Sequence, residues 1–140
     1  MPTWLIVEDE PDIQFMIQAM FQTWGVNGLA FDNGMEAIDW IDACDASPTL
    51  LSQRPDLALI DIRLPGVSGL EVAARLRSSS QLGRAAILLM TAYHLTSSQE
   101  KSAMRSSRAD KLIYKPLPTN EALHRLLSEL IRERQLNMSD

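Results

Sequence analysis

Five side chains that can bind cations or phosphate stand at the ends of apolar segments in this 140-residue chain: Glu8, Asp9, Asp61, Thr91 and Lys115. Carboxylates that crowd together repel one another, so their ionised form is favoured only when a cation lies among them. Mg²⁺ suits this set, because it combines one or two carboxylates with water and phosphate oxygens. A hydroxyl and an ammonium group can hold phosphoryl oxygens. The residue types therefore predict a phosphoryl group held between a metal and the lysine, with one carboxylate as the nucleophile.

Other kinds of metal and cysteine chemistry are disfavoured. Neither His94, His124 nor Cys44 lies at the spacing that a zinc site requires. The chain has a single cysteine, which excludes an intramolecular disulfide framework and is typical of a protein from a reducing cytosol. Oxygen ligands and a hard cation therefore remain the favoured chemistry for this sequence.

The charge of the chain is unevenly distributed. Residues 1–62 contain eleven acids and one base, whereas residues 63–140 contain seven acids and twelve bases, and the net charge is -5. This distribution disfavours a uniformly basic protein that binds nucleic acid directly. No apolar run is long enough to span a membrane, and the acidic N-terminal segment is unlike a signal peptide. We therefore expect a cytoplasmic protein with an acidic site that binds a cation.

Segments of two kinds alternate along the chain, and they must position the five side chains. Short, continuous apolar runs predict buried strands at residues 3–7, 26–31, 57–62, 86–91 and 111–114. Apolar residues at helical spacing predict five helices: from Pro11 to a stop at Gly25, over 34–44, from Ser68 to about Ser79, over 97–107 and around 123–131. Residues 45–55 are rich in turn-forming residues and are expected to form a long connection.

Five strands that are each followed by a helix predict an α/β fold, with a parallel sheet covered by helices on both faces. At this length we expect an open, doubly wound sheet rather than a barrel of about 250 residues. Open parallel sheets bind their ligands at the carboxyl ends of the strands. The five side chains named above lie at these ends, so we expect them to converge on one edge of the sheet.

Four motifs contain these residues: LIVEDEP at 5–11, LALIDIRLPGVSGLEV at 57–72, LLMTAY at 88–93 and YKP at 114–116. In order and spacing they resemble the motifs of receiver domains in bacterial two-component response regulators, and they cover essentially the whole chain. The resemblance implies a flavodoxin-like strand order of 2-1-3-4-5. It also implies a receiver domain over residues 1–134, followed by a short tail at 135–140 with no output domain.

The same resemblance implies a role for each acid of the site. Asp61 matches the aspartate that takes a phosphoryl group from a histidine kinase by in-line attack. Glu8 and Asp9 match the acidic pair that binds Mg²⁺ or Mn²⁺. Asp61 itself and the backbone carbonyl of Arg63 would complete the set of protein ligands. The chain would thus be a regulatory phosphoacceptor rather than an enzyme, although it would assist its own phosphorylation and slow dephosphorylation.

Thr91 matches the hydroxyl that acts as a switch in the family, and Lys115 matches the lysine that contacts the phosphoryl group. The bond between Lys115 and Pro116 is expected to be cis, which X–Pro bonds allow at low energetic cost. When Thr91 moves towards the phosphoryl oxygens, the loop after its strand would move with it. This would reorganise the face made by the helix at 97–107, the strand at 111–114 and the last helix.

The resemblance also implies the partners. A sensor histidine kinase or a histidine phosphotransfer protein would supply the phosphoryl group. A downstream protein would bind the reorganised face, which also offers a surface for a homodimer. Neither direct binding of nucleic acid nor association with a membrane is expected.

Four positions either differ from the usual family pattern or lie where the family tunes hydrolysis. Leu112 stands where the family often has an aromatic switch residue, while Tyr114 lies directly before the lysine. Arg63 and Tyr93, two residues after Asp61 and Thr91, occupy positions that tune hydrolysis of the phosphoryl group in the family. A long cation and a bulky aromatic ring there are expected to shield the site from water.

Other functions are compatible with parts of the pattern. A receiver-like module could bind proteins without phosphorylation, although the intact Asp61, Thr91 and Lys115 disfavour this. A metal-dependent phosphatase with an aspartyl nucleophile usually has a second acid two residues later, where this chain has Arg63. A doubly wound protein that binds flavin or a nucleotide would need a Gly-rich phosphate loop after the first strand, and none is present there.

Overall fold

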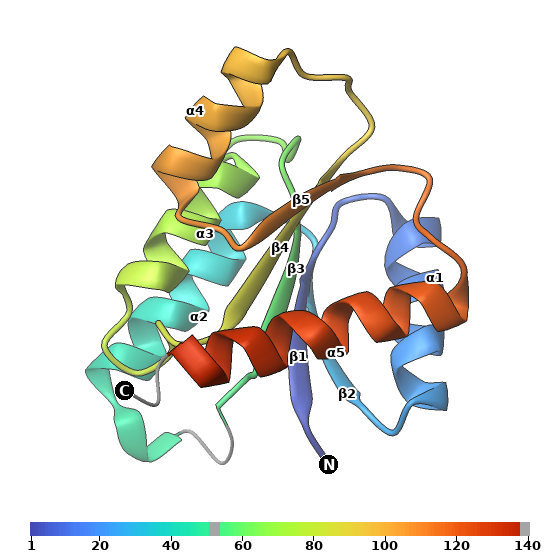
Figure 1. The fold of residues 1–140 in the computed structure, drawn as a ribbon. Coiled ribbons are helices and arrows are strands. Elements are labelled where there is room, and N and C mark those ends of the chain that lie inside the picture. The colour runs from blue at the N-terminus through green and yellow to red at the C-terminus, as the bar shows by residue number, and fades with distance from the viewer. Residues whose placement is uncertain (51–53, 138–140) are drawn as a thin grey trace.

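The apolar runs and amphipathic segments form strands and helices that alternate along the chain. The computed structural model describes residues 1–50 and 54–137 (Figure 1). The strands are β1 (Thr3–Val7), β2 (Asn27–Phe31), β3 (Leu57–Asp61), β4 (Ala86–Thr91) and β5 (Lys111–Tyr114). The helices are α1 (Pro11–Thr23), α2 (Gly34–Ala46), α3 (Gly69–Ser78), α4 (Ser97–Ser107) and α5 (Asn120–Asn137). This alternation confirms the prediction made from hydrophobic periodicity.

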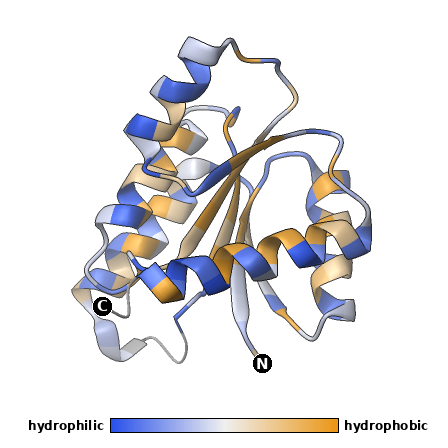
Figure 2. Ribbon diagram, viewed as in Figure 1, coloured by the Kyte–Doolittle hydropathy of each residue, from blue (hydrophilic) through white to orange (hydrophobic). Residues whose placement is uncertain are grey.

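The strands pair in parallel in the order β2-β1-β3-β4-β5, which confirms the expected doubly wound topology. Leu59 of β3 lies between Ile6 of β1 and Leu88 of β4. Helices α1 and α5 cover one face of the sheet, and α2, α3 and α4 cover the other (Figure 1). Because both faces are covered, every residue of β3 and β4 is buried. This is why these strands are hydrophobic up to their last residues, Asp61 and Thr91 (Figure 2).

The core consists of two apolar clusters, one on each face of the sheet. Successive side chains of a strand point to opposite faces. On β3, Leu57 and Leu59 therefore join the cluster that contains α1 and α5, whereas Ala58 and Ile60 join the one that contains α2 and α3. The helices are amphipathic (Figure 2), and none within residues 1–50 and 54–137 is long and apolar enough to cross a bilayer.

Some element boundaries differ from those expected. Helix α2 continues to Ala46, and the turn-rich connection after it contains a short 3₁₀ turn, η1 (Pro48–Leu50). Residues 51–53 of that connection lie outside the described residues. Helix α5 continues to Asn137, so the boundary expected at residue 134 falls inside a helix. At that boundary the helix still makes tertiary contacts, because Leu130 is buried against the sheet and Arg134 lies 3.7 Å from the carboxylate of Asp110.

One carboxylate, that of Asp45, joins the end of α2 to the end of α3. Its Oδ1 accepts hydrogen bonds from Ser79 Oγ at 2.7 Å and from the backbone N–H of Gln81 at 3.1 Å, and its Oδ2 accepts one from Arg75 at 2.8 Å. Burial alone would raise the pKa of Asp45. The bonds from Ser79, Arg75 and Gln81 outweigh that effect and lower the pKa to about 2.

We expect the substitution Asp45→Asn to lower the free energy of unfolding by about 1–3 kcal/mol at neutral pH, because charge-assisted hydrogen bonds are lost. The depressed pKa means that the ionised carboxylate stabilises the native state above its ordinary pKa. That contribution is lost as the pH falls from about 4 towards about 2, so the two proteins should converge there. Urea unfolding at neutral and acidic pH measures this difference.

The control is Asp42→Asn, whose carboxylate also contacts Arg75 but is 57% exposed. It should change stability much less, because an exposed ion pair contributes little. Equal losses in the two variants would contradict the role given to Asp45.

Candidate functional site

The site lies at the carboxyl edge of the sheet, where four neighbouring strands end. Glu8 and Asp9 directly follow β1, Asp61 ends β3, Thr91 ends β4 and Lys115 directly follows β5. The register pairs Asp61 with Met90, so Thr91 lies one residue further along the adjacent strand. The parallel topology thus brings the five predicted side chains to one edge, as expected from the sequence.

Three carboxylates meet there and one ammonium group joins two of them. Oxygens of Glu8, Asp9 and Asp61 all lie within 4.8 Å of one another. The Lys115 ammonium donates to Glu8 Oε1 at 2.7 Å and to Asp61 Oδ2 at 2.8 Å. Glu10 lies further away, at 3.8 Å from the same nitrogen. Lys115 therefore holds the ends of β1 and β3 together, and the peptide bond that follows it, to Pro116, is cis as expected.

The electrostatics of this cluster follow from burial. Glu8 is fully buried and Asp61 is 3% exposed, whereas Asp9 is exposed. Burial and the neighbouring Asp61 raise the pKa of Glu8 to about 8, although Lys115 acts in the opposite direction. Burial alone would lower the pKa of Lys115, but Asp61 and Glu8 outweigh it and raise this pKa. The lysine is therefore a stable cation, and one positive charge faces a larger negative charge.

An unsatisfied oxygen shows what the cluster lacks. Glu8 Oε2 is buried and has no hydrogen-bond partner among the described residues. A buried carboxylate oxygen without a partner is costly unless a cation or a proton compensates it. The acidic cluster of Glu8, Asp9 and Asp61 can therefore hold a metal ion, and its all-oxygen donor set suits a hard cation.

The loop after β3 presents the Asp61 carboxylate. Asp61 Oδ1 accepts a hydrogen bond from the backbone N–H of Arg63 at 3.0 Å, which orients the side chain. The loop then returns so closely that a Cβ atom on Gly69 would lie 1.9 Å from the carbonyl oxygen of Asp61. Only glycine fits at that position. Ser68 caps the following helix by accepting a bond from the Glu71 N–H at 3.3 Å, which confirms the predicted helix start.

Thr91 and Tyr93 shape the loop after β4. Thr91 is 1% exposed, and its Oγ1 accepts a hydrogen bond from the Tyr93 N–H at 3.2 Å. The guanidinium carbon of Arg63 lies 4.1 Å from the centre of the Tyr93 ring. A cation–π contact thus links the loops that follow β3 and β4.

Tyr114 makes contacts that the sequence did not indicate. Its hydroxyl donates to the carboxylate of Glu100 on α4 and accepts from the Leu95 N–H at 3.4 Å, while His94 stacks on its ring. The hydrogen bond to Glu100 raises the pKa of Tyr114. Leu112, at the usual aromatic position, instead packs against the apolar core. The only signal for Tyr114 was its place directly before Lys115.

Comparisons with known proteins point to one family. A family model described as the response regulator receiver domain matches residues 4–127. The transcriptional regulatory protein AruR of Pseudomonas aeruginosa is 32% identical over 138 residues, and the match covers 99% of this chain but 53% of AruR. This chain therefore spans about half the length of that relative. The polar-differentiation response regulator DivK of Brucella anthropi is 29% identical over 126 residues, which cover 90% of this chain and 94% of DivK.

A solved structure supports the same likeness. It is the receiver domain of a sensor histidine kinase from Pseudomonas aeruginosa, with a magnesium ion coordinated in its active-site cleft. The two chains are 25% identical and superpose with a TM-score of 0.75, over 94% of this chain and 98% of the other.

The raised pKa of Glu8 predicts that metal binding depends on pH. A carboxylate binds a cation in its ionised form, so binding must displace the proton that Glu8 holds below about pH 8. We expect the affinity for Mg²⁺ to rise roughly tenfold between about pH 6.5 and about pH 8. Titration of the metal-free protein, followed by tryptophan fluorescence or calorimetry, measures this change.

The matched variant is Glu8→Gln, which removes the titrating group and keeps its shape. It should bind Mg²⁺ more weakly and lose most of the pH dependence in this range. An affinity of the unmodified protein that stays constant over the range would contradict the assignment of the proton to Glu8.

Proposed function

The chain belongs to the response regulator receiver domain family of two-component signalling, and from this premise we propose that Asp61 is its phosphoacceptor. The phosphoryl donor is the phosphohistidine of a sensor histidine kinase or of a histidine phosphotransfer protein. The observation that carries the assignment is the Lys115 ammonium, which bridges Asp61 Oδ2 and Glu8 Oε1 inside an acidic cluster. Asp61 is the carboxylate of this cluster that both Lys115 and a backbone N–H orient.

The reaction requires a free carboxylate oxygen and stabilisation of the transferred group. A carboxylate oxygen of Asp61 attacks the phosphorus, the bond from phosphorus to the histidine nitrogen breaks, and an acyl phosphate forms. Lys115 passes from the carboxylate to the phosphoryl oxygens, where its charge offsets the added negative charge. Hydrolysis by water later returns Asp61 to its ionised form. The phosphorylated chain is itself the product of the reaction and acts as a regulator. An enzyme, by contrast, releases its product and returns unchanged.

A divalent cation completes the proposed site. Glu8, Asp9 and Asp61, with the backbone carbonyl of Arg63, would hold Mg²⁺ or Mn²⁺. The orphaned Oε2 atom of Glu8 supports this, because a cation satisfies it without a protein donor. When bound, the metal offsets the charge of the phosphoryl oxygens during transfer.

The signal leaves the site through the loop after β4. In the unphosphorylated arrangement, Thr91 Oγ1 accepts a hydrogen bond from the Tyr93 N–H. We infer that the Thr91 hydroxyl turns to donate to a phosphoryl oxygen, which shifts this loop. The loop is tied to α4 and β5 through Tyr114, Glu100 and Leu95. The face made by α4, β5 and α5 is therefore the proposed surface for a downstream protein or for a second copy of the chain, in the cytoplasm and without direct contact with nucleic acid.

A small phosphodonor tests the phosphoacceptor directly. We expect incubation with acetyl phosphate and Mg²⁺ to add a single phosphoryl group of about 80 Da to the intact protein. The substitution Asp61→Asn removes the nucleophile with little change in shape and should abolish the adduct. A mass increase that persists in this variant would place the phosphoryl group elsewhere. No adduct on the unmodified chain would favour a module that binds proteins without phosphorylation.

The contact between Arg63 and Tyr93 predicts a longer phosphoryl lifetime. We infer that the stacked pair, which links the loops after β3 and β4, restricts the approach of water to Asp61. A cation–π contact at an exposed site is worth about 0.5–1 kcal/mol, so we expect Tyr93→Ala or Arg63→Ala to accelerate dephosphorylation roughly two- to fivefold. Tyr93→Phe keeps the ring and should behave like the unmodified protein. The measurement is the loss of the phosphoryl group over time, followed by intact mass. Equal rates in the unmodified protein and the three variants would contradict the shielding.

A further inference from the structure

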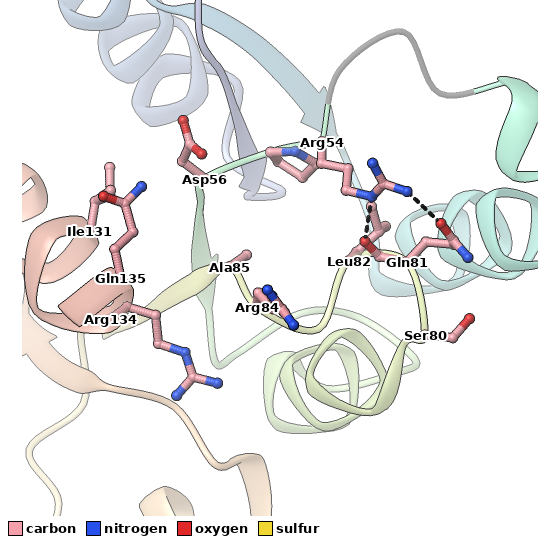
Figure 3. A pocket seen from close by; sticks show the side chains of 11 residues that line it. Arg54, Asp56, Ser80, Gln81, Leu82, Arg84, Ala85, Ile131, Arg134 and Gln135 are labelled. Carbon is pink, nitrogen blue, oxygen red and sulfur yellow. Dashed lines mark hydrogen bonds between the residues drawn. The ribbon is translucent and has the colours of Figure 1, made fainter. Parts of the chain in front are cut away.

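A cavity lies at the edge of the sheet opposite to the phosphoacceptor. Its volume is about 510 Å³, and Figure 3 shows the side chains that line it. Asp56 directly precedes β3 and Ala85 directly precedes β4, so the cavity opens at the amino ends of these strands, beside the last turns of α5. Asp61 and Thr91 lie at the carboxyl ends of the same strands. The length of a five-residue strand, about 15 Å, therefore separates the cavity from the site described above.

Three arginines from different parts of the chain line this cavity. In Figure 3, Arg134 comes from α5 on one side, Arg54 lies on the other side beside Gln81, and Arg84 lies between them. Asp56 is the acid among the lining residues. Its side chain is half-buried, and its single carboxylate can offset at most one of the three positive charges. The lining therefore carries an excess of positive charge within a chain whose net charge is -5.

The charges of these arginines are poorly compensated. Arg54 donates to the backbone oxygen of Gln81 at 3.0 Å and to its side-chain oxygen at 2.7 Å, and both acceptors are neutral. Arg84 is exposed, and within residues 1–50 and 54–137 no hydrogen bond or ion pair holds it. The Nε atom of Arg134 is buried without a hydrogen-bond partner in the same residues, and its Nη1 atom forms a long ion pair, at 3.7 Å, with the carboxylate of Asp110.

Two arginines of α3 are, in contrast, paired closely with carboxylates. Arg75 contacts Asp42 at 2.9 Å and Asp45 at 2.8 Å, and Arg77 contacts Asp110 at 2.8 Å. Within the described residues no carboxylate forms an ion pair with Arg54 or Arg84, so these two charges beside the cavity have no acidic partner. Guanidinium groups present several donors in a planar fork that matches phosphate and carboxylate groups. Positive forks around a cavity of the size typical for small ligands fit an anion rather than a neutral molecule.

We propose that this cavity binds a small anion with two or more phosphate or carboxylate groups. Three guanidinium groups from three segments surround the space, so an anion with several charged groups can contact more than one of them at once. Part of the cavity wall is apolar and can contact the uncharged part of the bound anion; it is formed by Pro55, Leu82 and Ile131. Bound in this way, the anion joins the last turns of α5 to the starts of β3 and β4 and stabilises the folded chain.

The test uses the full chain and two probes, pyrophosphate and citrate, which separate phosphate from carboxylate recognition. Divalent cations are left out, so that no anion can bind through a metal at the acidic edge. We expect saturable shifts of the backbone amide resonances of Gln81, Leu82 and Ala85 with at least one probe, and a dissociation constant below about 1 mM. If neither probe saturates, or if the shifts centre on Asp61 and Lys115, the proposal is wrong.

Two variants, one that removes a positive charge from the cavity and one that removes a negative charge, make the test more specific. Arg84→Gln should weaken binding at least fivefold without affecting the fold, because its side chain is exposed and unpaired in the described part of the chain. Asp56→Asn removes the acid from the wall and should tighten binding. Arg105 on α4 is exposed and lies outside the cavity, so Arg105→Gln makes the same charge change as a matched control and should leave the affinity unchanged. Equal weakening in Arg84→Gln and Arg105→Gln would reduce the effect to net charge and overturn the proposal.

Discussion

Two buried carboxylates that share one ammonium group are the interaction on which the functional edge of this structure depends. Glu8 and Asp61 are each within 2.8 Å of Lys115, and the three residues follow three different strands. Burial of a carboxylate is unfavourable unless it is paired. The single positive charge of Lys115 cannot balance the acidic side chains of Glu8, Asp61 and the adjacent Asp9. This edge of the sheet would therefore be stabilised by a bound cation. This excess of negative charge supports the proposed binding of a metal ion beside Asp61.

The rest of the fold keeps this strained electrostatic arrangement in place. Strands β3 and β4 are buried along their whole length, and helices pack against both faces, so the strand ends cannot move apart without opening two apolar clusters. The loops carry the adjustable parts. Gly69 lets the loop after β3 return close to the Asp61 carbonyl. In the loop after β4, the Tyr93 N–H donates a hydrogen bond to the Thr91 hydroxyl. A sheet packed on both faces, followed by loops held by a few hydrogen bonds, suits a protein that changes between two states.

The sequence was sufficient for the sheet and for the acidic cluster, because both follow from local patterns. Buried strands have continuous apolar runs, and parallel strands bring their carboxyl ends together, so Glu8, Asp61 and Lys115 had to converge. The contact of Tyr114 with Glu100 and the stack of Arg63 on Tyr93 could not be predicted, since each depends on how two segments that are separate in the sequence pack together. The extension of α5 to Asn137 likewise depends on tertiary contacts of Leu130 and Arg134. Periodicity carries no information about such pairs.

The uneven charge of the chain also acquires a spatial meaning from the topology. The acids Glu8, Asp9 and Asp61 lie at the carboxyl edge, whereas Arg84 and Arg134, from the basic half of the sequence, lie at the amino edge. Both edges are joined by β3 and β4, which are buried and have one packed arrangement. Coupling between two sites requires an element with two arrangements that both sites bias. Helix α5 is therefore the element through which an anion at the arginine-lined cavity would influence phosphorylation, because it borders the cavity and also belongs to the face that we propose phosphorylation reorganises.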